Sequence, residues 1–234
     1  MKPGYYSKQL SAERLRLCYE IAPPRVQRYL RSEIRFVLDK PDVSGRVLEL
    51  GCGYGRVLRP LLSKARSVVG IDTSCASLRM AQRLLGHSAR CRLARMNAAE
   101  LAFPDRRFDM VVCIQNGISA FQVEQRVLVE EAMRVTRPGG TVLFSSYSEA
   151  FWERRLEWFR LQAERGLIGA IDEAATGAGV IVCRDGFRAT TVGRDEFLSL
   201  TAPLGITPAI TEVDHSSLFC ELIAGPRPPA TGGV

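Results

Sequence analysis

The chain has 234 residues, of which 46% are hydrophobic and 24% are charged, and its formal net charge is +7 at pH 7. This composition is typical of a folded globular protein and excludes a disordered chain. Because no apolar run approaches the roughly 18–20 residues of a membrane span, and no apolar signal-peptide core follows Met1, we expect a cytoplasmic protein without a membrane span.

The cysteines and the first 40 residues, called the leader here, limit the possible classes of protein further. Seven scattered cysteines without a Cys-x-x-Cys pair predict reduced thiols, and no metal site is expected. The first 40 residues hold nine basic and four acidic residues, a net contribution of +5. This basic leader either forms a solvated helix face or attracts an anionic substrate, a nucleic acid or a lipid surface.

The first elements expected along the chain are two helices, because Pro23-Pro24 divides the leader. An apolar stripe marks the second helix and predicts that it packs on the domain; its members are Val26, Leu30, Ile34 and Val37. From Arg46 onward, short apolar runs alternate with helical segments, a pattern typical of βαβ units and a parallel sheet. The expected strands are 47–50, 67–71, 91–95, 108–114 and 141–145.

A further set of elements is expected after the fifth strand. Residues 149–165 read as a long amphipathic helix, and Asp185-Gly186 between two apolar runs predicts a β-hairpin. A helix over 194–202 and two last strands near 206–213 and 218–224 follow.

Three alternate glycines follow the first strand directly: Gly51, Gly53 and Gly55. Glycines there allow positive φ angles and let a ligand approach the backbone. Arg56 breaks the G-x-G-x-x-G dinucleotide spacing, which disfavours an oxidoreductase. Asp72 ends the second strand, where a carboxylate reaches the same crevice and can accept hydrogen bonds from two ribose hydroxyls.

Segments 47–55 (VLELGCGYG) and 69–74 (VGIDTS) resemble the class I S-adenosylmethionine-dependent methyltransferase family, and 97–105, 108–112 and 131–140 extend the resemblance in order. It implies a Rossmann-like α/β fold with a seven-stranded, mostly parallel sheet of order 3-2-1-4-5-7-6. N-terminal helices and a helix/β-hairpin insert after strand 5 would decorate this sheet. The implied cofactor is S-adenosyl-L-methionine, with S-adenosyl-L-homocysteine as its product.

The expected organisation is a single methyltransferase domain. Its parts are an N-terminal helical cap (1–40), a cofactor-binding core (41–147), an insert (148–193), the end of the core (194–225) and a disordered tail (226–234).

The resemblance also implies roles for individual residues. Glu49 would balance the methionyl ammonium or orient the glycine loop, and Gln115 would face the methionine end. Asn97 stands where the family often has an acid, and its amide oxygen can still accept from the adenine amino group. The complete predicted cofactor set is Glu49, Gly51, Cys52, Gly53, Gly55, Arg56, Asp72, Thr73, Asn97, Ala98 and Gln115.

Two residues are candidates for catalysis. Asn116 either hydrogen-bonds the acceptor or is a loop asparagine that tolerates an unusual backbone angle before Gly117. Tyr147 either binds the acceptor, acts as a weak base or simply packs. Aromatic side chains of the leader and the insert form either a lid over the acceptor or ordinary core; they are Tyr5, Tyr6, Tyr19, Trp152, Trp158 and Phe159.

The acceptor class is only partly constrained. Segment 115–119 (QNGIS) lacks the Asn/Asp-Pro-Pro-aromatic motif of amino-methylating enzymes, which disfavours nucleobase amino groups. We predict in-line transfer of a methyl group to a small molecule, perhaps an anion or thiol, by a monomer or homodimer. The alternatives are an RNA or protein methyltransferase that uses the basic leader, and a non-catalytic regulator that only binds the cofactor.

Overall fold

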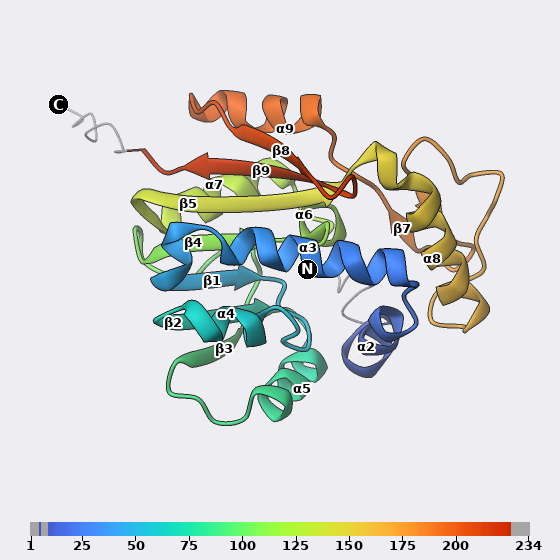
Figure 1. The fold of residues 1–234 in the computed structure, drawn as a ribbon, viewed down its shortest axis with the longest axis horizontal. Coiled ribbons are helices and arrows are strands. Elements are labelled where there is room, and N and C mark those ends of the chain that lie inside the picture. The colour runs from blue at the N-terminus through green and yellow to red at the C-terminus, as the bar shows by residue number, and fades with distance from the viewer. Residues whose placement is uncertain (1–4, 6–8, 226–234) are drawn as a thin grey trace.

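A seven-stranded sheet of order β3-β2-β1-β4-β5-β9-β8 runs through the centre of the chain in the computed structural model, which describes residues 5 and 9–225 (Figure 1). When the short hairpin strands are skipped, this is the expected order 3-2-1-4-5-7-6. The sheet strands are β1 (Arg46–Leu50), β2 (Ser67–Asp72), β3 (Cys91–Arg95), β4 (Phe108–Cys113), β5 (Thr136–Tyr147), β8 (Ala209–Val213) and β9 (Ser217–Ile223).

The first five strands are parallel, and β9 and β8 close the sheet antiparallel to β5. The inner strands carry uninterrupted apolar runs because both faces of the sheet are covered. Strand β5 begins at Thr136, five residues before its expected start, and its pairing with β4 shifts register between Phe108 and Met110. The Pro138-Gly139-Gly140 segment therefore belongs to an irregular strand entry.

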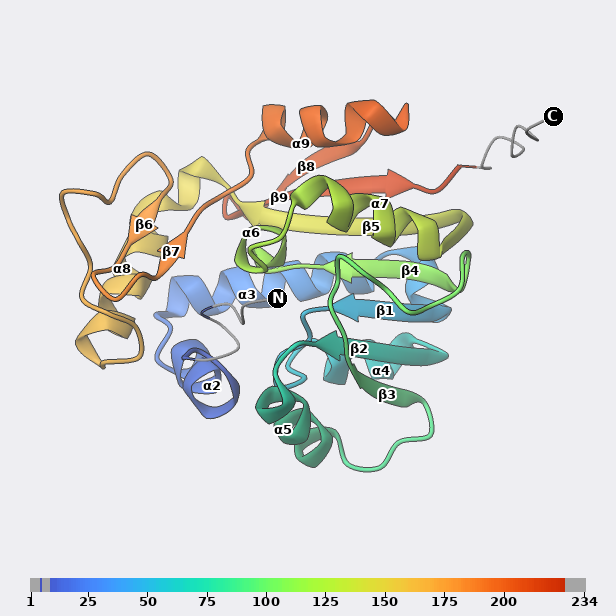
Figure 2. The same cartoon turned by 180° about the vertical axis from the view of Figure 1, so that it is seen from behind.

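Helices cover both faces of the sheet. Figure 1 shows α3 and α4 in front of the strands, and Figure 2 shows α5, α6 and α7 on the opposite face, with α9 packed against α7. The helices that flank the sheet are α3 (Pro24–Leu38), α4 (Leu58–Lys64), α5 (Cys75–Leu85), α6 (Gly117–Ala120), α7 (Gln125–Val135) and α9 (Arg194–Thr201). Short 3-10 turns occupy Pro41–Ser44, Glu149–Phe151 and Ala202–Leu204.

The leader and the insert meet at one end of the sheet. Helix α2 (Ala12–Glu20) precedes α3, and the insert consists of α8 (Trp152–Glu164) with a hairpin of β6 (Ile181–Val182) and β7 (Arg188–Ala189). The indole Nε1 of Trp158 donates to the carbonyl of Cys18 at 2.8 Å, so α8 is tied to α2. Both the split at Pro23-Pro24 and the hairpin at Asp185-Gly186 agree with expectation.

The buried stripe of α3 differs from its expected form in one position. Val26, Leu30 and Val37 are buried as predicted, but Ile34 is only partly buried and Glu33 is fully buried in its place. The reason is helical geometry, since Glu33 follows Leu30 by three residues and precedes Val37 by four, on the face toward the sheet.

Part of the expected organisation concerns residues that the structure does not describe. The proposed tail 226–234, the start of the cap and Tyr6 lie outside the described residues. Within residues 5 and 9–225, no helix is both long and apolar enough to span a bilayer.

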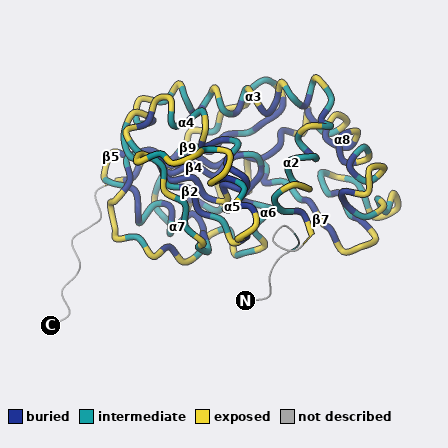
Figure 3. The backbone as a smooth tube through the Cα atoms, turned by 90° about the horizontal axis from the view of Figure 1, so that it is seen from below, coloured by how far each residue is buried: buried dark blue, intermediate teal, exposed yellow. Residues whose placement is uncertain are grey.

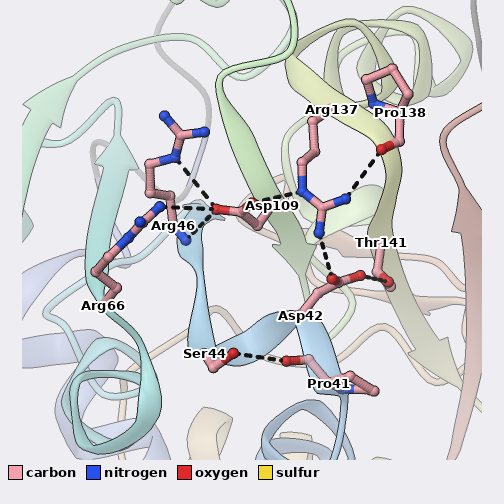
Figure 4. A network of polar contacts seen from close by, with 9 residues as sticks. All are labelled: Pro41, Asp42, Ser44, Arg46, Arg66, Asp109, Arg137, Pro138 and Thr141. Carbon is pink, nitrogen blue, oxygen red and sulfur yellow. Dashed lines mark hydrogen bonds and ion pairs between the residues drawn. The ribbon is translucent and has the colours of Figure 1, made fainter.

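A polar network joins the strands at their amino ends (Figure 4). The carboxylate of Asp109 accepts from the Arg46 backbone N–H and from the Arg137 guanidinium, each at 2.7 Å. Arg137 also donates to Asp42 at 2.9 Å, and the Thr141 hydroxyl donates to Asp42 at 2.7 Å. These contacts fasten β1, β4 and β5 together at the end of the sheet away from the glycine loop.

Candidate functional site

A large cavity opens at the carboxyl ends of the parallel strands, where the loops after β1, β2 and β4 converge. Its volume of about 1010 Å³ lies at the upper end of the range for ligand pockets, roughly 300–1,000 Å³. Its walls include the glycine loop, the amino end of α5, the loop after β4, and the helices α2 and α8. Ligand sites in open α/β sheets form at this edge.

The glycine loop is joined directly to Asp72. The Gly53 N–H donates to Asp72 Oδ2 at 2.9 Å, and the Ser74 N–H donates to Asp72 Oδ1 at 2.7 Å. Burial raises the pKa of Asp72, and these hydrogen bonds oppose that rise by stabilising the carboxylate. The second strand therefore presents a pre-oriented carboxylate beside a bend of bare backbone.

Gly51 adopts a φ of +71°, and an added Cβ would lie 2.4 Å from ring carbons of Phe121, a residue of the cavity wall. We expect Gly51→Ala to lower the free energy of unfolding by about 2–3 kcal/mol, because strain and displacement of the ring add up. Gly86→Ala is the matched control: its φ is +67°, but nothing lies within 4 Å of the added Cβ. Equal losses in chemical denaturation would show that the Phe121 contact contributes nothing.

Glu49 and Arg56 place an acidic and a basic side chain next to this bend. Glu49 is 4% exposed, and its Oε2 is buried without a hydrogen-bond partner among the described residues. Burial raises the pKa of Glu49 to about 8, with nearby Arg56 opposing the rise and Asp72 adding to it. The guanidinium of Arg56 lies 4.5 Å from the ring centre of Tyr19, and its buried Nε and Nη2 also have no such partner.

The loop after β4 holds a strained backbone. Gln115 and Asn116 both have left-handed conformations, with φ of 58° and 61°. The Gln115 N–H donates to Glu33 Oε2 and to Ser145 Oγ, both at 2.8 Å, while the buried Gln115 side-chain Nε2 has no partner in the described part of the chain. Consecutive left-handed residues persist only where their surroundings hold them in place, and Glu33 and Ser145 do so here.

Two predicted site residues, Asn116 and Gly55, contact other parts of the protein and do not reach the cavity. The Asn116 amide donates to the Thr190 carbonyl at 2.9 Å and accepts from the Ser146 hydroxyl at 2.8 Å, so it links the loop to the insert. An added Cβ on Gly55 would lie 3.2 Å from Ala81 and Leu85, which shows that Gly55 allows α5 to pack closely. Neither residue lines the cavity, and the backbone angle of Asn116 matches the loop-asparagine alternative.

Aromatic side chains of the leader, the insert and β5 form part of the cavity wall. Tyr147, Tyr19 and Trp158 line it together with Phe159 and the amide of Gln162. The guanidinium carbon of Arg155 lies 4.4 Å from the ring centre of Tyr147. Burial raises the pKa of Tyr147, with Arg155 opposing, so at neutral pH its phenol is a hydrogen-bond donor rather than a base.

The other predicted residues line this one cavity, and their side chains come from separate loops. Asn97 Oδ1 accepts from the Ala99 N–H at 3.1 Å, which fixes the loop after β3. The predicted residues in the cavity wall are Glu49, Gly51, Cys52, Gly53, Arg56, Asp72, Thr73, Asn97, Ala98, Gln115 and Tyr147. Sequence reasoning missed Glu33, Phe121 and Gln162; a glutamate within an apolar helical stripe was the one available signal, at Glu33.

A family model described as a methyltransferase domain matches residues 47–140, the segment that carries β1, the glycine bend, Asp72 and β4. The chain contains a class I S-adenosylmethionine-dependent methyltransferase domain. The resemblance predicted from 47–55 and 69–74 is thereby confirmed, together with the Rossmann-like fold.

Curated relatives of this methyltransferase domain match about half of the chain. Phosphatidylethanolamine N-methyltransferase of Cereibacter sphaeroides is 41% identical over 106 residues, which are 44% of this chain and 51% of the relative. 2-Methyl-6-phytyl-1,4-hydroquinone methyltransferase of Synechocystis is 28% identical over 149 residues, 56% of this chain and 46% of the relative. Fatty-acid O-methyltransferase of Mycolicibacterium smegmatis is 32% identical over 127 residues, covering 49% and 43%. The chain thus spans about half the length of these relatives.

Solved structures share the fold over most of the chain. DhpI in its complex with SAH superposes with a TM-score of 0.62 at 22% identity, covering 96% of this chain and 98% of DhpI. A SAM-dependent methyltransferase from Aquifex aeolicus gives 0.60 at 15% identity, covering 92% and 100%. At this level of identity the likeness concerns the fold.

Proposed function

We propose that the protein binds S-adenosylmethionine in this cavity and transfers its methyl group to a small molecule. The observation that carries the proposal is the hydrogen bond between Gly53 N and Asp72 Oδ2. It holds a side-chain-free bend beside a carboxylate, which is the combination that an adenosyl group with a free ribose requires.

The residues present fit this cofactor. Asp72 would accept from the ribose hydroxyls, and the unpartnered carboxylate oxygen of Glu49 would receive the methionyl ammonium. The unpartnered nitrogens of Arg56 and Gln115 would meet oxygens of the methionine part, because buried polar atoms are costly unless they are paired. When bound, the cofactor supplies a methyl group on a positively charged sulfur that a nucleophile displaces in line.

The part of the cavity wall formed by Tyr147 and the insert would hold the acceptor, and we call it the acceptor end. Tyr147 would donate a hydrogen bond to the acceptor, Gln162 would offer an amide, and Trp158 and Phe159 supply flat apolar walls. The walls come from the leader and the insert and enclose the site, which supports a small acceptor and the exclusion of water. The relatives are named for a phospholipid, a hydroquinone and a fatty acid, so the family leaves the acceptor atom open.

The decisive experiment offers the protein labelled S-adenosylmethionine and a fractionated extract of small molecules, and follows label in products. We expect a labelled small molecule, and none from a cofactor-site variant. Calorimetric binding of the cofactor without turnover in any fraction would favour the non-catalytic alternative, and label in RNA or protein would favour the macromolecular one.

Tyr147→Phe tests the acceptor end. We expect kcat/KM for the acceptor to fall by about 3–10-fold, the value of one neutral hydrogen bond of roughly 0.5–1.5 kcal/mol, while the Kd for the cofactor is unchanged. The control is Tyr54→Phe, since Tyr54 lines the cavity beside the glycine bend. A change in cofactor affinity with unchanged kcat/KM would place Tyr147 at the wrong end of the cavity.

A further inference from the structure

One edge of the molecule carries arginines without balancing acids. Residues 73–99 contain five arginines and no aspartate or glutamate. We call these five the basic edge; all are exposed, and they are Arg79, Arg83, Arg90, Arg92 and Arg95. They come from α5, the following loop and the edge strand β3, on the side of the molecule that Figure 3 views from below.

The charges of the basic edge are not neutralised within the described part of the chain. Its arginines form none of the ion pairs found there, and Arg90 and Arg95 donate only to backbone carbonyls, of Ala65 and Thr73. In the leader, by contrast, two arginines form ion pairs within the chain: Arg25 and Arg28 both pair with Asp214 at 2.9 Å. Part of the charge of the leader is therefore offset by Asp214, whereas the basic edge has no such acid among the described residues.

The arrangement of the basic edge suits a surface rather than a single ion. Five guanidinium groups spread over a helix, a loop and a strand do not converge on one pocket, so they match an array of separate anionic groups. Arg59 and Lys64 are also exposed on α4, which packs on β2, and they add to the positive charge near this edge.

The apolar neighbours of these arginines distinguish a lipid surface from a nucleic acid. Leu84 is 45% exposed on α5, next to Arg83. Residues 55–102 contain no tyrosine, phenylalanine or tryptophan, so the elements that carry the edge offer no aromatic side chain on which single-stranded bases could stack. Arginines around an exposed leucine can instead contact lipid headgroups while the leucine enters the interface.

The basic edge also borders the cavity. Arg95 lines it, as do Cys75 and Ala76 at the amino end of α5, and all three are exposed. We propose that the basic edge binds an anionic lipid surface and holds the rim of the cavity against it, so that a lipid-borne acceptor can enter. The docking rests on charge and exposure alone, whereas the delivery of an acceptor rests on the proposed function.

Vesicle sedimentation of the full chain without cofactor tests the docking. We expect binding to phosphatidylcholine vesicles that contain one part in three of phosphatidylglycerol, little binding to phosphatidylcholine alone, and release by added salt. The variant Arg79→Glu, Arg83→Glu, Arg92→Glu should bind at least about tenfold more weakly, because each basic residue near the surface contributes roughly 1 kcal/mol.

The matched control reverses the charge at three exposed arginines of the insert, with the changes Arg165→Glu, Arg184→Glu and Arg188→Glu. Its net charge therefore changes by the same amount as that of the basic-edge variant. It should retain binding. Equal losses in both variants, equal binding to both vesicle types, or tighter edge-dependent binding to an RNA duplex would overturn the proposal. A melting temperature for each variant confirms that it is folded. Vesicle binding by a protein that takes up no cofactor would reject the proposed function alone.

A fluorescence measurement tests whether the rim of the cavity faces the lipid surface. Cys75 is an exposed thiol at the rim, and a polarity-sensitive fluorophore attached there, in a Cys91→Ser background, should shift to shorter wavelength when the anionic vesicles bind. Binding without a shift would place the rim away from the lipid and overturn that half of the proposal.

Discussion

Asp72→Ala should weaken the Kd for S-adenosylmethionine by on the order of 100-fold or more. The carboxylate would lose its hydrogen bonds to two ribose hydroxyls, each worth about 1.5–3 kcal/mol for a charged acceptor. The glycine bend would also lose a support, since Gly53 N donates to Asp72 Oδ2 at 2.9 Å. Isothermal calorimetry on folded protein measures the effect.

Asp72→Asn and Asp195→Ala sharpen this test. The asparagine keeps an acceptor oxygen but loses the charge, so its affinity should lie between those of the wild type and the alanine variant. Asp195 is exposed in the first turn of α9, and its loss should leave the Kd unchanged. Retained affinity in Asp72→Ala would mean that the ribose lies elsewhere, and the proposed function would lose its central contact.

Glu33→Gln should change the pH dependence of stability by up to about 3 kcal/mol. Burial raises the pKa of Glu33 from 4.5 to about 7, opposed by the nearby hydroxyls of Ser217 and Ser145, by the Gln115 N–H and by the charge of Arg56. A carboxyl whose pKa is raised on folding stabilises the fold below pH 4.5, and this contribution is lost as the pH rises through about 7. Each pKa unit corresponds to about 1.4 kcal/mol.

The glutamine variant does not ionise, so its stability should not show this fall, and its amide oxygen can still accept from Gln115 N. We expect its free energy of unfolding relative to wild type to increase between pH 5 and pH 8 in chemical denaturation. Glu49 titrates in the same direction but is present in both proteins, so it cancels. Glu153→Gln, an exposed change on α8, is the control; identical pH curves for Glu33→Gln and wild type would contradict the assignment.

The Glu33 contact couples the leader to the site. Its carboxylate reaches from α3 across the sheet edge to the strained Gln115 backbone, while Asn116 bonds to the insert through Thr190. The loop after β4 is therefore supported by two segments that lie outside the residues 47–140 matched by the family model.

The sequence by itself indicated the βαβ units, the glycine bend and the position of Asp72, and the resemblance of its motifs to a known family implied the strand order and the cofactor. The hydrophobic period, the glycine spacing and the alternation of strands with helices are local properties of the chain. Right-handed crossovers join such βαβ units into one parallel sheet. Each side chain at the end of a parallel strand then falls at the same edge, which is why residues of separate loops line one cavity.

The tertiary structure alone decided which residues support that site and which only pack. Asn116 and Gly55 stand in the expected motifs, yet their contacts are with the insert and with α5. Glu33 and Gln162 come from helices far away in the chain and reach the site through packing angles that no local pattern specifies. Likewise, the basic leader was evident from composition, but only the folded chain shows that Asp214 takes up part of its charge and leaves the α5–β3 edge as the positive surface.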